Sequence, residues 1–201
     1  MEGEQWHVFL TRNVGEQRVE PADLGLGVGP AVVPREHVGE KDREVELWLP
    51  PRGLEELDQF GEKFGVPNMF AEAFHTREYA DGETFETCGL HVTPVRVPHY
   101  QLQTFALRVS DGTSTLAYSG DSAPSPQLAE VGRDADLFLC EATLRESVEG
   151  GNGLRGHLSA EEAVAAFKES RARRLVIIHR PDELPLDRGI ERAADGDVFT
   201  F

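Results

Sequence analysis

Three side chains that are good metal ligands stand at the ends of three predicted strands. His99, Asp121 and His179 each directly follow an extended, largely apolar run. Side chains at strand ends are held by rigid backbone and project into the loops, where open sheets build their sites. Gly120 lets the chain turn sharply before Asp121 and pass close to a bound ion. Two imidazoles and one carboxylate form a ligand set that suits zinc, manganese or iron, so the sequence predicts a divalent-cation site.

Two further residues, Glu141 and His157, have the chemistry of an acid–base couple. Glu141 follows the apolar run 135–140, and His157 precedes a predicted helix. An imidazole titrates near neutral pH, so a carboxylate beside it can hold or accept its proton. We expect the two side chains to share a proton and to assist a leaving group as a general acid. The alternative, a hydrogen-bonded pair that only positions a loop, stays open.

The elements that must position these residues begin at Val45. Leu54, Leu57, Phe60 and Phe64 are spaced three and four apart, which predicts a helix over 54–64. Strands are predicted at 45–49, 90–97, 104–109, 115–119, 135–140 and 174–178, with helices near 128–131 and after Ser159, whose spacing to Glu162 is that of a capping box. Asp195-Gly196-Asp197 predicts a turn before a last short strand. The predicted order is therefore antiparallel hairpins first and then strand–helix–strand–helix–strand. Continuous apolar strands are typical of a sheet covered on both faces, so we expect a sheet with helices on its outer face.

Composition limits the classes of function. Acidic residues outnumber basic ones 36 to 20, for a net charge of −16, which disfavours nucleic-acid binding. The two cysteines, Cys88 and Cys140, show no Cys-x-x-Cys spacing, so neither a disulfide framework nor a zinc ribbon is expected. No signal peptide and no membrane-spanning apolar run is visible, and we expect a soluble, cytoplasmic protein.

Two regions of different character divide the chain. Residues 1–44 are rich in Gly, Pro and charged residues, and their apolar residues follow neither the period of a strand nor that of a helix for long. We expect this N-terminal segment to be poorly packed, apart from strand-like pieces at 6–10 and 31–33. Residues 45–201 are expected to form the domain that carries the chemistry.

That domain resembles the C-terminal two-thirds of metallo-β-lactamase-fold hydrolases of the ribonuclease Z-like branch. The resemblance rests on Leu49-Pro50-Pro51-Arg52-Gly53, Pro98-His99, Phe105-Ala106-Leu107-Arg108, Tyr118-Ser119-Gly120-Asp121, Cys140-Glu141-Ala142-Thr143, Gly156-His157-Leu158-Ser159 and Ile178-His179, in that order. It implies an α+β fold, an αββα sandwich, and dinuclear metal chemistry. In the family the residues matching His99 and His179 each bind one metal and the residue matching Asp121 bridges both. Those matching Glu141 and His157 are implicated in protonating the leaving group.

The chain departs from the family pattern in its N-terminal part. The motif His-x-His-x-Asp-His, which supplies four further ligands, is absent, and Cys140 stands where the family usually has histidine. We therefore expect a sandwich that is incomplete at its N-terminus and holds at most one ion. The ligand set leaves Zn²⁺, Mn²⁺ and Fe²⁺ open.

Two hypotheses of function follow. In the first, the chain is a metal-dependent hydrolase that acts on a small-molecule ester or phosphodiester and is impaired by its missing ligands. The tight turn between Ser110 and Ser114 replaces a long insertion common in tRNA-processing members, which disfavours tRNA. In the second, the chain is a catalytically inactive, truncated protein of this fold. It would then serve as a structural or interaction module, for example as a homodimer that covers the exposed sheet.

Overall fold

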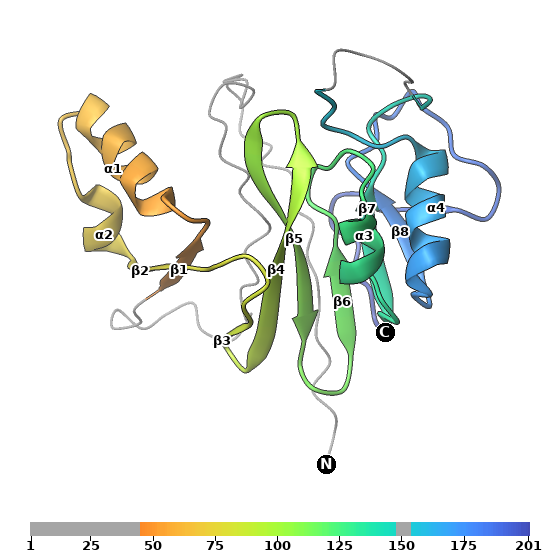
Figure 1. Ribbon diagram of the computed structural model, residues 1–201, viewed down its shortest axis with the longest axis horizontal. Helices are drawn as coiled ribbons and strands as arrows, with labels where there is room; N and C mark the ends of the chain where they lie inside the picture. The colour runs from red at the N-terminus through yellow and green to blue at the C-terminus, as the bar shows by residue number, and fades with distance from the viewer. Residues whose placement is uncertain (1–44, 148–153) are drawn as a thin grey trace.

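A computed structural model describes residues 45–147 and 154–201 of the 201-residue chain (Figure 1). The predictions for residues 1–44 lie outside the described residues. The elements are β1 (Glu46–Leu49), α1 (Gly53–Lys63), α2 (Met69–Ala73), β2 (His75–Glu78), β3 (Phe85–Thr87), β4 (Leu90–His99), β5 (Leu102–Ser110), β6 (Thr115–Tyr118), α3 (Pro126–Val131), β7 (Leu137–Glu141), α4 (Ala160–Ser170), β8 (Leu175–Ile178) and β9 (Glu191–Arg192).

The main sheet has seven strands in the order β3-β4-β5-β6-β7-β8-β9. Pairing is antiparallel from β3 to β6 and parallel from β6 to β9. Because β4 runs antiparallel to β5 and β5 antiparallel to β6, the carboxyl ends of β4, β6, β7 and β8 meet at one end of the sheet. The predicted order of hairpins followed by strand–helix–strand–helix–strand is confirmed.

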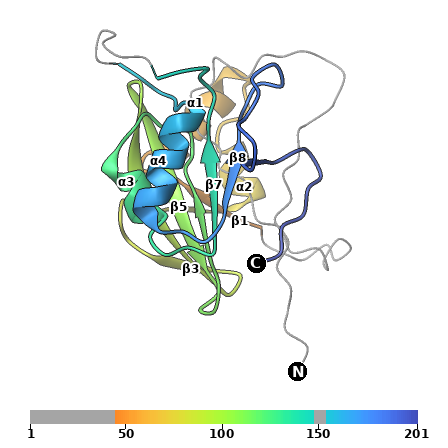
Figure 2. The same ribbon diagram turned by 90° about the vertical axis from the view of Figure 1, so that its right-hand side faces the viewer.

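Both faces of β7 are buried, as its continuous apolar sequence predicts. Phe138 and Cys140 face the larger core, where Leu128 and Val131 of α3 pack with Ala163 of α4. On the other face, the side chains of β7 pack in a smaller cluster with β8 and Phe199. Figure 2 shows α3 and α4 side by side on the same face of the sheet. The sheet with helices on its outer face is therefore as predicted.

The exposed edge of β4 is protected along the stretch that leads to His99. Pro94 and Pro98 have no N–H, and the N–H of Arg96 donates to Asp81 Oδ1 over 2.7 Å. The carbonyls of the two prolines accept from Gly82 N at 2.7 Å and Ala123 N at 2.6 Å. Proline and a carboxylate acceptor at outward positions prevent another strand from pairing there. The outer edge of β4 therefore forms hydrogen bonds with loops of the same chain, and one of these loops carries Asp121.

A small unit stands apart from the main sheet. In it β1 and β2 form a parallel two-stranded sheet, joined through α1 and α2 (Figure 1). Trp48 of β1 stacks on Phe85 of β3 with ring centroids 3.9 Å apart. Tyr79 stacks on the same ring and meets Phe105 of β5 edge-on. Aromatic contacts of this kind attach the small unit to the main sheet.

Several details differ from the sequence predictions. Helix α2 and strand β3 are short, and periodicity does not reveal elements of three to five residues. Asp195 and Gly196 do form a turn, but residues 198–201 are not a strand, and the last strand, β9, precedes the turn. Within the described residues, none of the helices has the length and apolar character needed to cross a membrane.

The N-terminus of α4 is fixed by the predicted capping box. Glu162 N donates to Ser159 Oγ over 3.3 Å, and Ser159 N donates to Glu162 Oε2 over 2.8 Å. Glu162 also pairs with Arg155, whose Nε donates to the carbonyl of His157. Through Arg155, the cap of α4 is therefore linked to the loop that carries His157.

Replacing Ser159 with alanine is expected to lower the free energy of unfolding by about 1 kcal/mol, because one helix N–H loses its acceptor. Urea denaturation measures this change. Ser147, whose hydroxyl lies 3.2 Å from that of Ser159, provides the control. Ser147→Ala should cost less than about 0.5 kcal/mol, as surface substitutions usually do. Equal losses in the two variants would contradict a capping role.

Candidate metal and acid–base site

The loop after β6 brings Asp121 to the end of β4. Gly120 has φ +60°, and a Cβ there would lie 2.7 Å from the carbonyl oxygen of Phe105. The predicted sharp turn at Gly120 is present. At this turn the chain passes close to the backbone of β5. Beyond it, Ala123 N donates to Pro98 O. The loop thus crosses the end of β5 and places Asp121 beside His99, although their strands are not neighbours in the sheet.

His99 is held in a single tautomer. Its Nδ1 lies 2.7 Å from the carbonyl oxygen of Gly156. A carbonyl only accepts, so Nδ1 carries the proton and Nε2 keeps its free lone pair. Histidine ligands of metals are commonly oriented by such a hydrogen bond to the other ring nitrogen.

Glu141 is the buried centre of the site. Its side chain is 0% exposed and its carboxylate lies within hydrogen-bond distance of four groups. Oε1 accepts from Ser122 N at 2.9 Å and faces His157 Nδ1 at 3.0 Å. Oε2 lies 3.0 Å from Thr143 N and 2.9 Å from Thr143 Oγ1. Hydrogen bonds to a charged acceptor are stronger than neutral ones, so this carboxylate is firmly placed.

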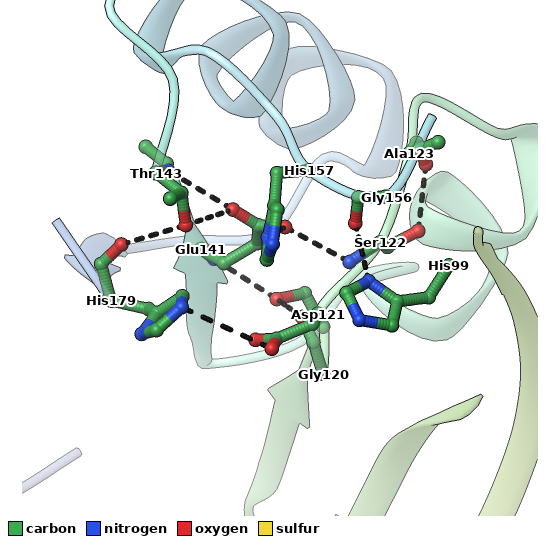
Figure 3. A network of polar contacts seen from close by, with 12 residues as sticks. His99, Gly120, Asp121, Ser122, Ala123, Glu141, Thr143, Gly156, His157 and His179 are labelled. Atoms are coloured by element: carbon green, nitrogen blue, oxygen red, sulfur yellow. Dashed lines mark hydrogen bonds and ion pairs between the residues drawn. The ribbon is translucent and has the colours of Figure 1, made fainter. Parts of the chain in front are cut away.

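The predicted contact between Glu141 and His157 is present (Figure 3). The hydrogen bond to Glu141 raises the pKa of His157, and burial opposes the rise. The His157 ring, 16% exposed, lies between the rings of His99 and His179, with centroids 4.9 and 5.7 Å away. The imidazole therefore keeps a proton at higher pH than a free one and holds it beside the other two histidines.

The predicted ligands gather around Asp121 (Figure 3). Ligand atoms of His99, Asp121 and His157 all lie within 4.8 Å of one another. His179, predicted as the third ligand, lies on the other side of Asp121, with its Nε2 3.9 Å from Oδ2. The side chains of Asp121 and His179 are 39% and 55% exposed, so both are open to solvent. Sequence reasoning did not foresee that His157 would lie as close to this centre as the predicted ligands.

Tyr100 and Gly156 are site residues that the sequence analysis missed. Tyr100 N donates to Arg155 O over 3.0 Å, and its ring meets those of His99 and His157 edge-on. The ring lies so close to Gly156 that a Cβ there would be 2.2 Å from Tyr100 Cε2. One feature of the sequence could have identified them. Tyr100 directly follows His99, and Gly156 directly precedes His157.

Replacing Gly156 with alanine is expected to displace the Tyr100 ring or the loop that carries His157. Since the carbonyl of Gly156 orients His99, a predicted metal ligand, we expect the affinity for added Zn²⁺ to fall by about tenfold or more, as for other changes behind a ligand. Titration against a competing chelator measures the affinity. In the double variant Gly156→Ala/Tyr100→Ala the steric clash is absent, so part of the loss should be recovered. An unchanged affinity in Gly156→Ala would contradict this account.

Cys140 occupies the buried position before Glu141. Its side chain belongs to the core between the sheet and the helices, and burial raises the pKa of its thiol. A buried, protonated thiol packs as a small apolar side chain. The residue therefore contributes to packing behind the site.

Comparisons with known proteins agree with this architecture. The model of the family described as "Beta-lactamase superfamily domain" matches residues 33–180. An uncharacterized protein of Mycobacterium leprae is 36% identical over 112 residues, which are 55% of this chain and 38% of that protein. The mitochondrial ribonuclease Z of Drosophila melanogaster is 27% identical over 166 residues, 76% of this chain and 21% of that protein. The chain thus spans about two fifths of the length of the mycobacterial relatives that it matches.

Solved structures show the same fold. The metallo-beta-lactamase fold protein YhfI from Bacillus subtilis superposes with a TM-score of 0.64 at 18% identity, over 80% of this chain and 66% of that chain. Zn²⁺-bound PqqB from Methylobacterium extorquens has a TM-score of 0.62 at 23% identity, over 79% and 66%. The predicted fold class is confirmed, while the boundary at residue 44 stays a prediction. The similarity to a ribonuclease Z agrees with the predicted ribonuclease Z-like branch. The chain therefore belongs to the beta-lactamase superfamily domain family and has the metallo-β-lactamase fold.

Proposed function

We propose that this chain is a metal-dependent hydrolase that cleaves a small phosphodiester or a related ester. His99, Asp121 and His179 would hold a divalent ion, and Glu141 with His157 would protonate the leaving group. The observation that carries the proposal is the buried Glu141 carboxylate, which fixes His157 beside Asp121 and two further imidazoles. A purely structural role would not require three histidines and a solvent-exposed carboxylate to meet at the end of one sheet.

The donor set fits a divalent transition metal such as Zn²⁺, Mn²⁺ or Fe²⁺. Nε2 of His99 is free because Nδ1 donates to Gly156 O. Asp121 and His179 are partly exposed and lie next to each other. Imidazole and carboxylate donors suit these ions, and such an ion lowers the pKa of bound water and polarises a phosphoryl or carbonyl oxygen. His157 is better suited to proton transfer than to ligation, because its bond to Glu141 favours the protonated ring.

The chain's own residues account for the proton transfer. Glu141 keeps Nδ1–H of His157 in a fixed hydrogen bond, and its own position is set by Ser122 and Thr143. The second proton of the imidazolium, on Nε2, is then available to an oxygen atom that leaves with the product. A general acid placed in this way contributes about 10²- to 10⁴-fold to a reaction rate.

The surroundings of the site favour a small substrate. Strands β5 and β6 are joined by a tight turn in which Asp111 Oδ1 accepts from the N–H groups of Thr113 and Ser114. This turn leaves no room for an extended arm of the kind that grips a tRNA. The net charge of −16 also opposes a long polyanion.

Metal analysis of the purified protein, followed by hydrolysis of bis(p-nitrophenyl) phosphate with Zn²⁺ or Mn²⁺, tests the proposal. We expect metal to bind and the ester to be cleaved, and both should be lost in His179→Ala. His91, an exposed residue of β4 beside Glu86, provides the matched control, and His91→Ala should retain both. Absence of both metal and turnover in the wild type would contradict the proposal and favour a non-catalytic module.

A further inference from the structure

Arg180, the residue after His179, has an unusual environment for a charged side chain. It is 9% exposed, and among the described residues the acceptors of its guanidinium are all main-chain carbonyls. NH1 donates to Ala142 O at 2.7 Å and Leu144 O at 2.8 Å. Nε and NH2 donate to Leu184 O at 3.3 Å and Pro185 O at 3.0 Å. Within residues 45–147 and 154–201, no carboxylate is within ion-pair distance of it.

Through these bonds one side chain joins two segments of the chain. Residues 142–144 follow β7, and residues 184–185 belong to the loop after β8. The rigid fork of an arginine presents five donors in fixed directions, so it can serve four carbonyls at once. A buried carbonyl that loses its donor is costly, and a lysine in this place could not reach all four in the same geometry.

The two segments carry the groups of the proposed site. Thr143 lies on the first and Glu141 directly precedes that segment, and His179 directly precedes Arg180 in the loop after β8 that contains the second. Thr143 Oγ1 lies 3.0 Å from His179 O, and Ala142 N donates to Ile178 O. His179 has φ +47°, a left-handed conformation that persists in a non-glycine residue only where its surroundings enforce it. The bonds of the Arg180 side chain to residues 142, 144, 184 and 185 add to these contacts on both sides of His179.

We propose that Arg180 is a positioning residue, whose guanidinium sets the relative placement of Glu141 and His179 by clamping the loops after β7 and β8 together. The catalytic part of this inference rests on the proposed function, since it matters for turnover only if these residues act. The geometric part does not. Removing the clamp should free His179 from its strained conformation and shift the Glu141–Thr143 segment.

The test compares Arg180→Lys and Arg180→Ala with Arg173→Lys, an exposed arginine paired with Asp136. Imidazole signals of ¹⁵N-histidine-labelled, metal-free protein report the placement of His157 and His179. We expect these signals to move in the Arg180 variants and to stay in Arg173→Lys. Zn²⁺ affinity and kcat on bis(p-nitrophenyl) phosphate should fall by about 10- to 100-fold in Arg180→Lys, with KM within about twofold. Millimolar guanidinium should restore part of kcat in Arg180→Ala.

The outcomes separate the two proposals. A wild type without metal or turnover removes the proposed function, and the imidazole signals still decide the role of Arg180. If Arg180→Lys has a lower Tm but wild-type imidazole signals, affinity and kcat, then the clamp is only structural and the inference is overturned. Should Arg180→Ala fail to fold, Arg180→Lys carries the test, because it keeps a donor and the positive charge.

Discussion

Glu141→Gln is expected to lower kcat by about 10²- to 10⁴-fold, the usual contribution of a general acid, because it removes the carboxylate that orients His157 and favours its protonated form. The amide has one oxygen and one NH₂ group, but the carboxylate it replaces faces donors on both sides, at Ser122 N, His157 Nδ1 and Thr143 N. One of these donors must then face an NH₂ group. Since hydrogen bonds to a charged group contribute about 1.5–3 kcal/mol each, the free energy of unfolding should also fall by at least about 2 kcal/mol.

The pH profile distinguishes a proton-transfer role from simple destabilisation. The bond to Glu141 raises the pKa of His157, so the acid form persists to higher pH in the wild type. Without the carboxylate the pKa of His157 falls, and the alkaline limb of the kcat profile should move to lower pH. Glu161→Gln, at an exposed position in the first turn of α4, should leave both kcat and profile unchanged. A Glu141→Gln protein with an unmoved alkaline limb would argue against general-acid action by this pair.

Asp121→Ala is expected to abolish metal binding and to lower kcat/KM by about 10³-fold or more. A bound ion contributes several kcal/mol of transition-state stabilisation, and about 4 kcal/mol corresponds to a factor of about 10³. Asp121 is the side chain around which His99, His157 and His179 gather, so its removal takes the carboxylate ligand from the centre of the proposed site. Metal content after gel filtration and steady-state kinetics measure the two effects.

Stability should respond differently to this substitution. The Asp121 side chain is 39% exposed, and surface changes usually stay within about 0.5 kcal/mol. The melting temperature without metal should therefore be close to that of the wild type, in contrast to Glu141→Gln. Asp187→Ala, in the exposed loop after β8, is the matched control and should retain metal and activity. Retention of metal by Asp121→Ala would place the ion elsewhere and contradict the proposed ligand set.

The local elements around the site were largely predictable. The apolar runs of β7 and β8, the hairpins from β4 to β6 and the capping box of α4 appear where the sequence predicts them, because neighbouring residues alone set their period and caps. The short elements α2, β3 and β9 depend on long-range pairing and packing, as in the stack of Trp48 on Phe85. Their sequences carry too few residues for a period to be recognised.

The residue types at the strand ends determined, from the sequence alone, that imidazoles and carboxylates would meet at the end of one sheet. The order of hairpins followed by strand–helix–strand–helix–strand was sufficient for this, because in that order β4, β6, β7 and β8 run in the same direction and their carboxyl ends meet at one end of the sheet. Only the tertiary structure decided which atoms face one another. It turned Nδ1 of His99 to Gly156, brought His157 as close to Asp121 as the predicted ligands, and buried Arg180 among carbonyls. Such choices depend on loops between distant strands, whose contacts no local pattern of residues records.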